Sequence, residues 1–363
     1  LTNAPSICVH CSVGCNTIAS ERYGKLRRIM SRYNGAVNGY FICDRGRFGY
    51  EFVNDDKRIK SALIRSGKDM KPLTVEYEGL ISTLKQSFSK DKKIIGIGSP
   101  RASAESNYAL MTLVGRANFY AGVSKKEFLL TGTVLEFLQQ SGVRTPSLKQ
   151  IEKADAILVI GEDLTNTAPM VALAVRQALR NIPLEEAKNK GIPLWNDAPL
   201  RELAQNDRSP LFIVNSYADP LDEIAEDVLR ASADVISNFG FAVANNLDDS
   251  YPVSKSTGND IHNLSEKVAL ALKNAKHPLI ISGVSCGDKT TVNAALNIAG
   301  ALQSAGSEVM LSIVLPECNS MGLALIGGES FEEIILQDEN RELDTLVVLE
   351  NDLYRRAGEE VVS

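Results

Sequence analysis

Four of the six cysteines lie near the beginning of the chain, in a pattern that suits metal ligation. Three fall within eight residues and the fourth follows later, so the spacing is Cys8-x2-Cys11-x3-Cys15-x27-Cys43. Thiolate sulfur is the soft ligand that iron-sulfur clusters require, and four thiolates complete a 4Fe-4S site. Gly14, just before Cys15, can supply the unusual backbone angles of a tight loop. The spacing favours one 4Fe-4S cluster held by these four cysteines.

A four-cysteine zinc site is the alternative. Zinc sites of this type usually combine two CxxC-type pairs, and only one pair, Cys8 with Cys11, is present here. His10 lies between these two cysteines and could replace a thiolate, although four cysteines are already available. In this alternative, zinc would fold a basic module that binds protein or nucleic acid on an α/β scaffold.

The region around the cysteines is basic in an otherwise acidic chain. Residues 1–60 hold ten Lys or Arg against five Asp or Glu, a net charge of +5, whereas the rest of the chain carries −11. These side chains could offset cluster charge, dock neighbouring subunits or bind nucleic acid, and packing in a small sheet would explain many of them. The basic and aromatic residues concerned are Arg22, Lys25, Arg27, Arg28, Arg32, Arg45 and Arg47 with Tyr23, Tyr33, Tyr40, Phe41, Phe48 and Tyr50.

From about residue 61, apolar runs of strand length alternate with longer segments of helical character. Such alternation predicts a parallel sheet covered by helices. Two loop-like stretches, Gly142–Pro146 and Leu247–Asp260, could mark where the chain crosses between two lobes. At least six strands are expected, at 94–98, 156–160, 211–214, 279–282, 309–314 and 346–349.

Little else in the sequence indicates catalysis. Only three histidines are present. Hydrolytic triads and general acid-base catalysis usually need a histidine base, so neither is indicated. Cys286 and Cys318 are expected to be free thiols without chemistry. The turn Gly96–Gly98 follows a predicted strand, but Arg101 stands where a dinucleotide fingerprint needs its third glycine. A nicotinamide site is therefore not expected.

No run approaches the roughly 20 apolar residues of a membrane helix, and the first residues lack the features of a signal peptide. These features predict a cytoplasmic protein. The chain opens at Leu1 without an initiator Met, and it stops soon after an apolar run. We expect it to be a central fragment of a longer subunit.

Several stretches resemble the G-subunit family of NADH-quinone oxidoreductase, whose members are the large iron-sulfur component of bacterial complex I. This family lies within the wider molybdopterin oxidoreductase-like group, and the resemblance extends over essentially the whole chain. The stretches that carry it are 6–53 with its four cysteines, 96–103, 159–163, 171–178, 319–322 and 350–356.

The resemblance implies an α/β fold in which a small 4Fe-4S domain precedes two interleaved lobes with mostly parallel sheets. We expect the cluster domain at residues 1–60. The first lobe would comprise 61–145 with 262–340, and the second 146–261 with 341–363.

The resemblance also implies a function. The chain would be an electron-transfer and scaffold subunit of an enzyme that couples NADH oxidation to quinone reduction and proton translocation. Its one 4Fe-4S cluster would lie off the main electron path. Its partners would be other subunits of the complex I peripheral arm, with no nucleic acid, at the cytoplasmic face of the bacterial inner membrane. The fragment alone is not expected to turn over.

Molybdopterin relatives bind a pterin dinucleotide at the turns after their strands, and here those turns are unsuitable. Glu162-Asp163 and Glu350–Asp352 would repel phosphate oxygens, and Asn215 stands where relatives place an Asp. In the region where a catalytic relative offers a metal ligand, Ser124 is a poor lone candidate. The sequence predicts no molybdenum and no molybdopterin.

Overall fold

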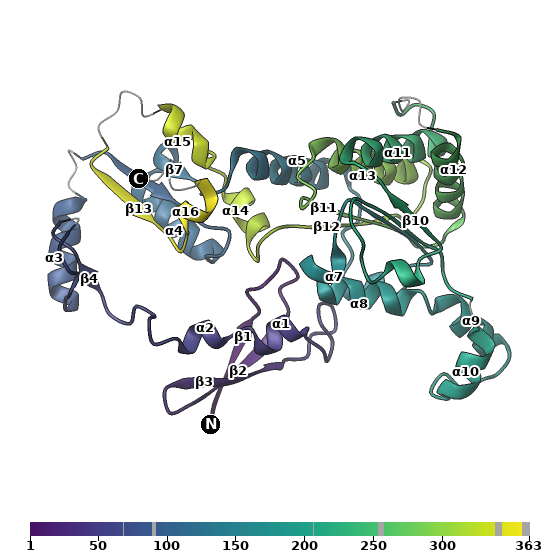
Figure 1. The fold of residues 1–363 in the computed structure, drawn as a ribbon, viewed down its shortest axis with the longest axis horizontal. Helices are drawn as coiled ribbons and strands as arrows, with labels where there is room; N and C mark the ends of the chain where they lie inside the picture. Colours follow the sequence, from purple (N-terminus) through teal and green to yellow (C-terminus); the bar gives the residue numbers. More distant parts are fainter. Residues whose placement is uncertain (68, 89–91, 206, 253–257, 338–342, 358–363) are drawn as a thin grey trace.

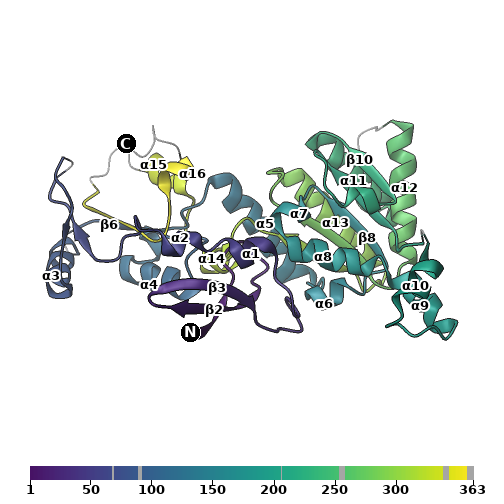
Figure 2. The ribbon, with the colours of Figure 1, turned by 60° about the horizontal axis from the view of Figure 1, so that its bottom comes forward.

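The structure is a computed structural model that describes residues 1–67, 69–88, 92–205, 207–252, 258–337 and 343–357. It has three main parts (Figure 1): a small antiparallel sheet at the N-terminus, a larger α/β lobe and a smaller α/β lobe. Figure 2 shows the N-terminal sheet lying along one side of the two lobes. The predicted α/β class with parallel sheets is confirmed.

The N-terminal part is a three-stranded antiparallel sheet followed by two short helices. Tyr23 and Gly24, both with positive φ, form the two-residue turn of a hairpin whose twist suits such a backbone. The elements are β1 (Thr2–Ile7), β2 (Asn16–Arg22), β3 (Lys25–Ser31), α1 (Asp44–Phe48) and α2 (Glu51–Asn54).

The larger lobe is a parallel five-stranded sheet in the order β10-β9-β8-β11-β12 with helices on both faces. Its three central strands are buried throughout, as expected where helices cover both faces. The strands are β8 (Ala156–Ile160), β9 (Leu211–Asn215), β10 (Asp227–Arg230), β11 (Pro278–Gly283) and β12 (Met310–Val314).

Two apolar cores fill this lobe, one on each face of the sheet. One face is covered by α5 (Lys125–Ser141), α11 (Ala233–Leu247), α12 (Asn259–Asn274) and α13 (Lys289–Ser304). The other is covered by α6 (Leu148–Ile151), α7 (Leu164–Thr167) and α8 (Pro169–Ala178). Beyond α8, α9 (Asn181–Asn189) and α10 (Asp197–Ala204) project from the lobe (Figure 1).

The smaller lobe has a parallel three-stranded sheet in the order β13-β6-β7. Its apolar core joins this sheet to residues of α4 and α14. The elements are β6 (Ile94–Ile97), β7 (Phe119–Tyr120), β13 (Thr345–Val348), α4 (Ala104–Val114), α14 (Ser320–Ile326), α15 (Phe331–Gln337) and α16 (Leu353–Ala357). The connecting segment from the N-terminal part contains β4 (Leu63–Ile64), β5 (Leu73–Thr74) and α3 (Tyr77–Ser87).

All six predicted strands are present, as β6, β8, β9, β11, β12 and β13. The strand pairing, however, differs from the predicted lobes 61–145 with 262–340 and 146–261 with 341–363. In the structure β11 and β12 join the sheet of β8, and β13 pairs with β6, for example Thr345 with Ile94. Apolar periodicity locates strands, but it carries no information on which distant strands pair.

The chain crosses between the lobes at other places than the two predicted loops. Gly142–Pro146 lies within the larger lobe, where Val143 joins its core. Leu247–Asp260 links α11 and α12 of that same lobe, and its residues 253–257 lie outside the described part of the chain. The chain instead crosses from the smaller to the larger lobe along α5, which contacts both α13 and α14. It returns to the smaller lobe in the segment after β12. No helix in the described ranges is long and apolar enough to span a membrane.

Candidate iron-sulfur site

The four predicted ligands come from two segments of the N-terminal part. Cys8, Cys11 and Cys15 lie on the loop between β1 and β2, which is closed by a hydrogen bond from the Cys8 N–H to the Cys15 carbonyl at 2.8 Å. Gly14 has a φ of +69°, so a glycine suits this turn. Cys43 immediately precedes α1.

The structure brings these segments together around the first turns of α1. A Cβ atom placed on Gly46 would lie 3.3 Å from the Cys8 sulfur and 3.9 Å from the Cys43 sulfur. Both thiols therefore face Gly46, whose missing side chain leaves them room. Cys15 is buried with Ile42 and with Met170 of α8, and Cys8 and Cys43 pack against the same apolar cluster.

Burial makes three of these thiols, Cys8, Cys11 and Cys15, hard to ionise. It raises the pKa of Cys8 and Cys11, and it raises the pKa of Cys15 to about 12. The other three thiols raise the Cys15 pKa further, because neighbouring thiolates repel one another. The Arg45 guanidinium has the opposite, smaller effect on the pKa of Cys8 and Cys11. This mutual influence places all four thiols near one another.

A single zinc ion and a 4Fe-4S cluster need different arrangements of four thiolates. Four thiolates on one zinc ion have Zn–S bonds of about 2.3 Å, so their sulfurs must crowd around one point. Within the described ranges, no group of three or more His, Cys, Asp or Glu side chains is placed to hold one ion. A 4Fe-4S cluster instead offers each cysteine its own iron, which tolerates a wider spread of sulfurs.

His10, the candidate substitute ligand, has ordinary packing contacts. Its ring stacks edge-on against Phe52 with centroids 6.4 Å apart, and it lies against the backbone at Gly49. Burial lowers the His10 pKa, as do the nearby Arg45 and Arg101 side chains. These contacts explain His10 without a metal.

Three hydrogen bonds connect the cysteine loops to the larger lobe. The Arg45 guanidinium donates to the Asn166 carbonyl at 2.6 Å. The Leu148 N–H donates to the Ala36 carbonyl at 3.0 Å, and the Leu315 N–H donates to the Ser12 hydroxyl at 3.2 Å. The N-terminal part is therefore anchored on three sides of the cysteine site.

Sequence reasoning missed two residues at this site. Met170 of α8 closes the apolar pocket although it is far from the cysteines in sequence, and nothing in its local pattern distinguishes it from a core residue. Cys318 was expected to be a free thiol without chemistry, and it is near enough to Cys8 to raise the Cys8 pKa. The Cys318 thiol lies 3.7 Å from the carbonyl oxygens of Pro100 and Arg101.

The acidic turn after β8 occupies the crevice where open α/β sheets usually bind ligands. The sheet order reverses between β8 and β11, and such a switch point is the usual ligand site. Glu162 is 1% exposed there. Its Oε2 lies so close to Gly283 that a Cβ atom at position 283 would have no space. The Thr167 hydroxyl donates to Glu162 Oε1 at 2.7 Å, and the Asn215 amide donates to the Glu162 carbonyl at 3.0 Å.

The acidic turn after β13 is filled in a similar way in the smaller lobe. The Asn351 amide donates to the carbonyls of Gly98 and Gly122 at 2.7 and 2.8 Å. Its side-chain oxygen accepts from Arg356 at 2.8 Å, and Arg356 pairs with Glu317 at 3.0 Å. Ser124 begins α5, where its hydroxyl accepts from the Glu127 N–H. Protein side chains thus occupy both sheet edges.

Comparison with known proteins first defines the class of the chain. Residues 1–55 match the molybdopterin oxidoreductase Fe4S4 domain. The fold is similar to that of acetylene hydratase from Pelobacter acetylenicus, with a TM-score of 0.51 and 11% identity over 82% of this chain and 42% of that one. The N-terminal Fe4S4 domain and the molybdopterin oxidoreductase-like fold are therefore confirmed.

More particularly, the chain is similar to the G subunit of NADH-quinone oxidoreductase. It is 44% identical over 98% of its length to the proteins of that name from Salmonella typhimurium and Escherichia coli K12. The predicted resemblance is confirmed. The chain spans 39% of the length of these relatives.

The buried Glu162 carboxyl predicts a pH-dependent stability. Burial raises the Glu162 pKa, so the folded state holds this proton at a pH where the unfolded chain has lost it. Stability should therefore fall as pH rises above about 4.5, by at most about 1.4 kcal/mol per pH unit, until Glu162 ionises in the folded state. Glu162→Gln, which resembles the protonated form, should escape this loss.

Urea unfolding of wild type and Glu162→Gln from pH 4 to pH 8 measures this difference, with the exposed Glu202→Gln as the matched control. The assignment would be contradicted if the free energy of unfolding of the wild type, relative to that of Glu162→Gln, increased as the pH rises.

Proposed function

We propose that the chain is the cluster-bearing part of an iron-sulfur subunit of respiratory NADH:quinone oxidoreductase. The observation that carries the proposal is the convergence of Cys8, Cys15 and Cys43 on one apolar cluster, with Cys11 close enough to influence Cys15. Together they would hold one 4Fe-4S cluster, which supplies one-electron transfer when bound.

Two features favour the cluster over zinc. Among the described residues, the thiols come together without the tight grouping that a single ion requires. The matching Fe4S4 domain also covers all four cysteines. Basic side chains that would serve nucleic-acid binding in the zinc alternative have contacts within the protein. Arg45 bonds to the Asn166 carbonyl, Arg32 to the Asn16 side chain and Arg28 to the Ser20 hydroxyl. No nucleic-acid partner is proposed.

The activity proposed for the whole assembly is that of the named relatives: NADH oxidation coupled to quinone reduction and proton translocation. Partner subunits of the peripheral arm would surround the chain at the cytoplasmic face of the bacterial inner membrane. Within it, the cluster would serve electron exchange, the integrity of the arm, or both. The three hydrogen bonds that anchor the cysteine loops on the larger lobe support a structural contribution.

We also propose that the α/β lobes bind no molybdenum and no pterin dinucleotide. Glu162 and Asn215 fill the switch point of the larger sheet, and Asn351 fills the edge of the smaller one. A phosphate at the switch point would have to displace a buried carboxyl. That carboxyl occupies the space that the phosphate needs, and it would repel the phosphate when ionised.

The first prediction concerns the four ligands. Replacing any one of Cys8, Cys11, Cys15 or Cys43 by Ser should remove most of the iron and of the broad visible absorption, because a cubane corner loses its soft ligand. Cys286→Ser is the matched control outside the site and should keep both. Iron and acid-labile sulfide are measured on anaerobically reconstituted protein.

Cys318→Ser tests the thiol near the site in the same assay and should also retain the cluster. Full iron retention in the Cys15→Ser variant would contradict the ligand assignment.

The second prediction is that the chain alone does not oxidise NADH. A hydride carries two electrons, and a one-electron cluster cannot accept it without a flavin. The measurement is NADH-dependent ferricyanide reduction by the purified chain, with the flavin content of the same sample as the control. Turnover in flavin-free protein would refute this expectation.

A further inference from the structure

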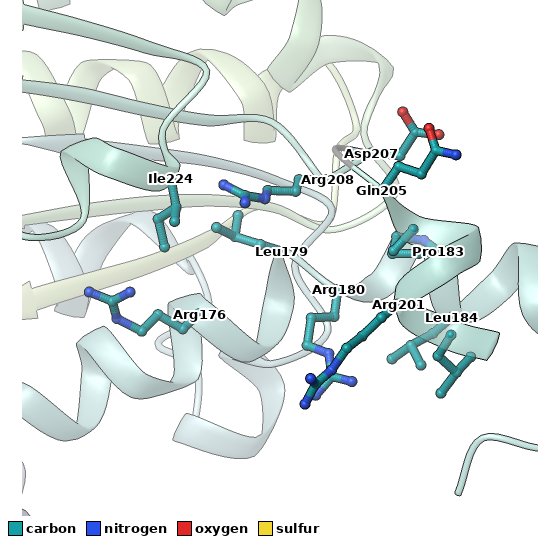
Figure 3. Close-up of a pocket in the computed structure, with 12 residues that line it drawn as sticks. Arg176, Leu179, Arg180, Pro183, Leu184, Arg201, Gln205, Asp207, Arg208 and Ile224 are labelled. Atoms are coloured by element: carbon teal, nitrogen blue, oxygen red, sulfur yellow. The ribbon is translucent and has the colours of Figure 1, made fainter. Parts of the chain in front are cut away.

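A hollow lined by arginines lies on the larger lobe, and its lining includes none of the four cysteines. It has a volume of about 280 Å³ and lies where the chain leaves α8 and forms α9 and α10. Figure 3 shows Arg180 and Arg201 lying together beside α10, with Arg176 and Arg208 on the side of Leu179 and Ile224. These four arginines are the cationic lining of the hollow.

The positive charge of this lining is only partly balanced. Asp197 pairs with both Arg201, at 2.6 Å, and Arg180, at 3.7 Å. Among the described residues, neither Arg176 nor Arg208 forms an ion pair, and the Arg176 guanidinium bonds only to the Pro220 carbonyl at 3.3 Å. Four arginines thus line one hollow, against a single lining carboxylate, Asp207, in a chain whose net charge is −6. Such a site attracts carboxylates.

The floor of the hollow is apolar. Leu179 and Leu200 are buried there, and Pro183, Leu184, Ala204 and Ile224 add apolar surface. Gln205 and Asp207 complete the lining. A cavity of this size is at the small end of ligand sites but accommodates one apolar side chain well. Cationic groups around an apolar floor match a ligand that carries both an apolar group and carboxylates.

The surface beside the hollow extends the apolar contact area. Ile182 is 43% exposed and Leu194 44%, and Trp195, the single tryptophan of the chain, is 82% exposed. Large apolar side chains left exposed on α9 and on the segment before α10 indicate an interaction surface, and Trp and Arg are enriched at the centres of protein interfaces. The surface is larger than a free anion such as phosphate could use.

We propose that this surface docks a partner protein through an acidic amphipathic segment. One apolar side chain of the segment enters the hollow, and its neighbouring carboxylates pair with Arg176 and Arg208. Trp195 then packs against the apolar face of the segment. This surface does not involve the cluster. The experiments below therefore test it separately from the function proposed above.

The test uses the tryptophan as a reporter. The full chain is titrated with a short amphipathic peptide of glutamate, leucine and alanine, and with the same peptide carrying glutamine instead of glutamate. The acidic peptide should shift the Trp195 emission to shorter wavelength, because the indole loses contact with water. Binding should weaken as salt rises from about 50 to about 500 mM.

The variants locate the binding. Arg176→Gln with Arg208→Gln should weaken acidic-peptide binding by about tenfold or more. The exposed Arg58→Gln should bind like wild type. A charge-reversed double variant, Arg176→Glu with Arg208→Glu, should prefer a lysine peptide, which rules out mere unfolding as the cause.

Four results would overturn the proposal, three of them from the peptide titrations. Those three are equal binding of the glutamine peptide, no binding of the acidic peptide, and inorganic phosphate that competes with the peptide and gives the same emission shift. The last result would define a small-anion site. Binding to vesicles of anionic phospholipid in place of the peptide would also overturn it and would assign the surface to a membrane.

Discussion

The convergence of four buried or half-buried thiols is the constraint on which the arrangement of the N-terminal part depends. Each of these thiols has lost water, and burial raises the pKa of Cys8, Cys11 and Cys15. Uncharged thiols contribute little to holding the loops together, whereas thiolates bound to iron join two segments that are distant in sequence. Three features hold the cysteines close together: the small sheet, the space left by Gly46 and the contact with Met170.

The lobes that carry this site retain a parallel α/β fold but have filled the places where such folds usually bind ligands. At the switch point of the larger sheet, Glu162 is held by Thr167 and Asn215, and its side chain fills the space above Gly283. A fold shared with acetylene hydratase therefore does not carry that enzyme's chemistry with it. The larger lobe anchors the cysteine site through three hydrogen bonds to the N-terminal part.

Much of this could be predicted from sequence, because the signals are local. Thiol spacing identified the four cysteines that the structure brings together, and apolar runs located six strands. In the two parallel sheets, β7 and β10 were missed: β7 has only two residues, and β10 is an edge strand with alternating exposure. The pairing of β11 with β8, the proximity of Cys318 to Cys8 and the arginine-lined hollow all depend on contacts between distant residues. No local pattern contains that information.

The central claim is that the four cysteines hold one iron-sulfur cluster. Its most direct test is metal analysis together with electron paramagnetic resonance of the full chain, prepared without oxygen and reduced by one electron. The account predicts about four iron and four sulfide per chain, and the signal of a single reduced 4Fe-4S cluster. One zinc per chain, in a colourless protein that gives no such signal after reconstitution, would contradict it.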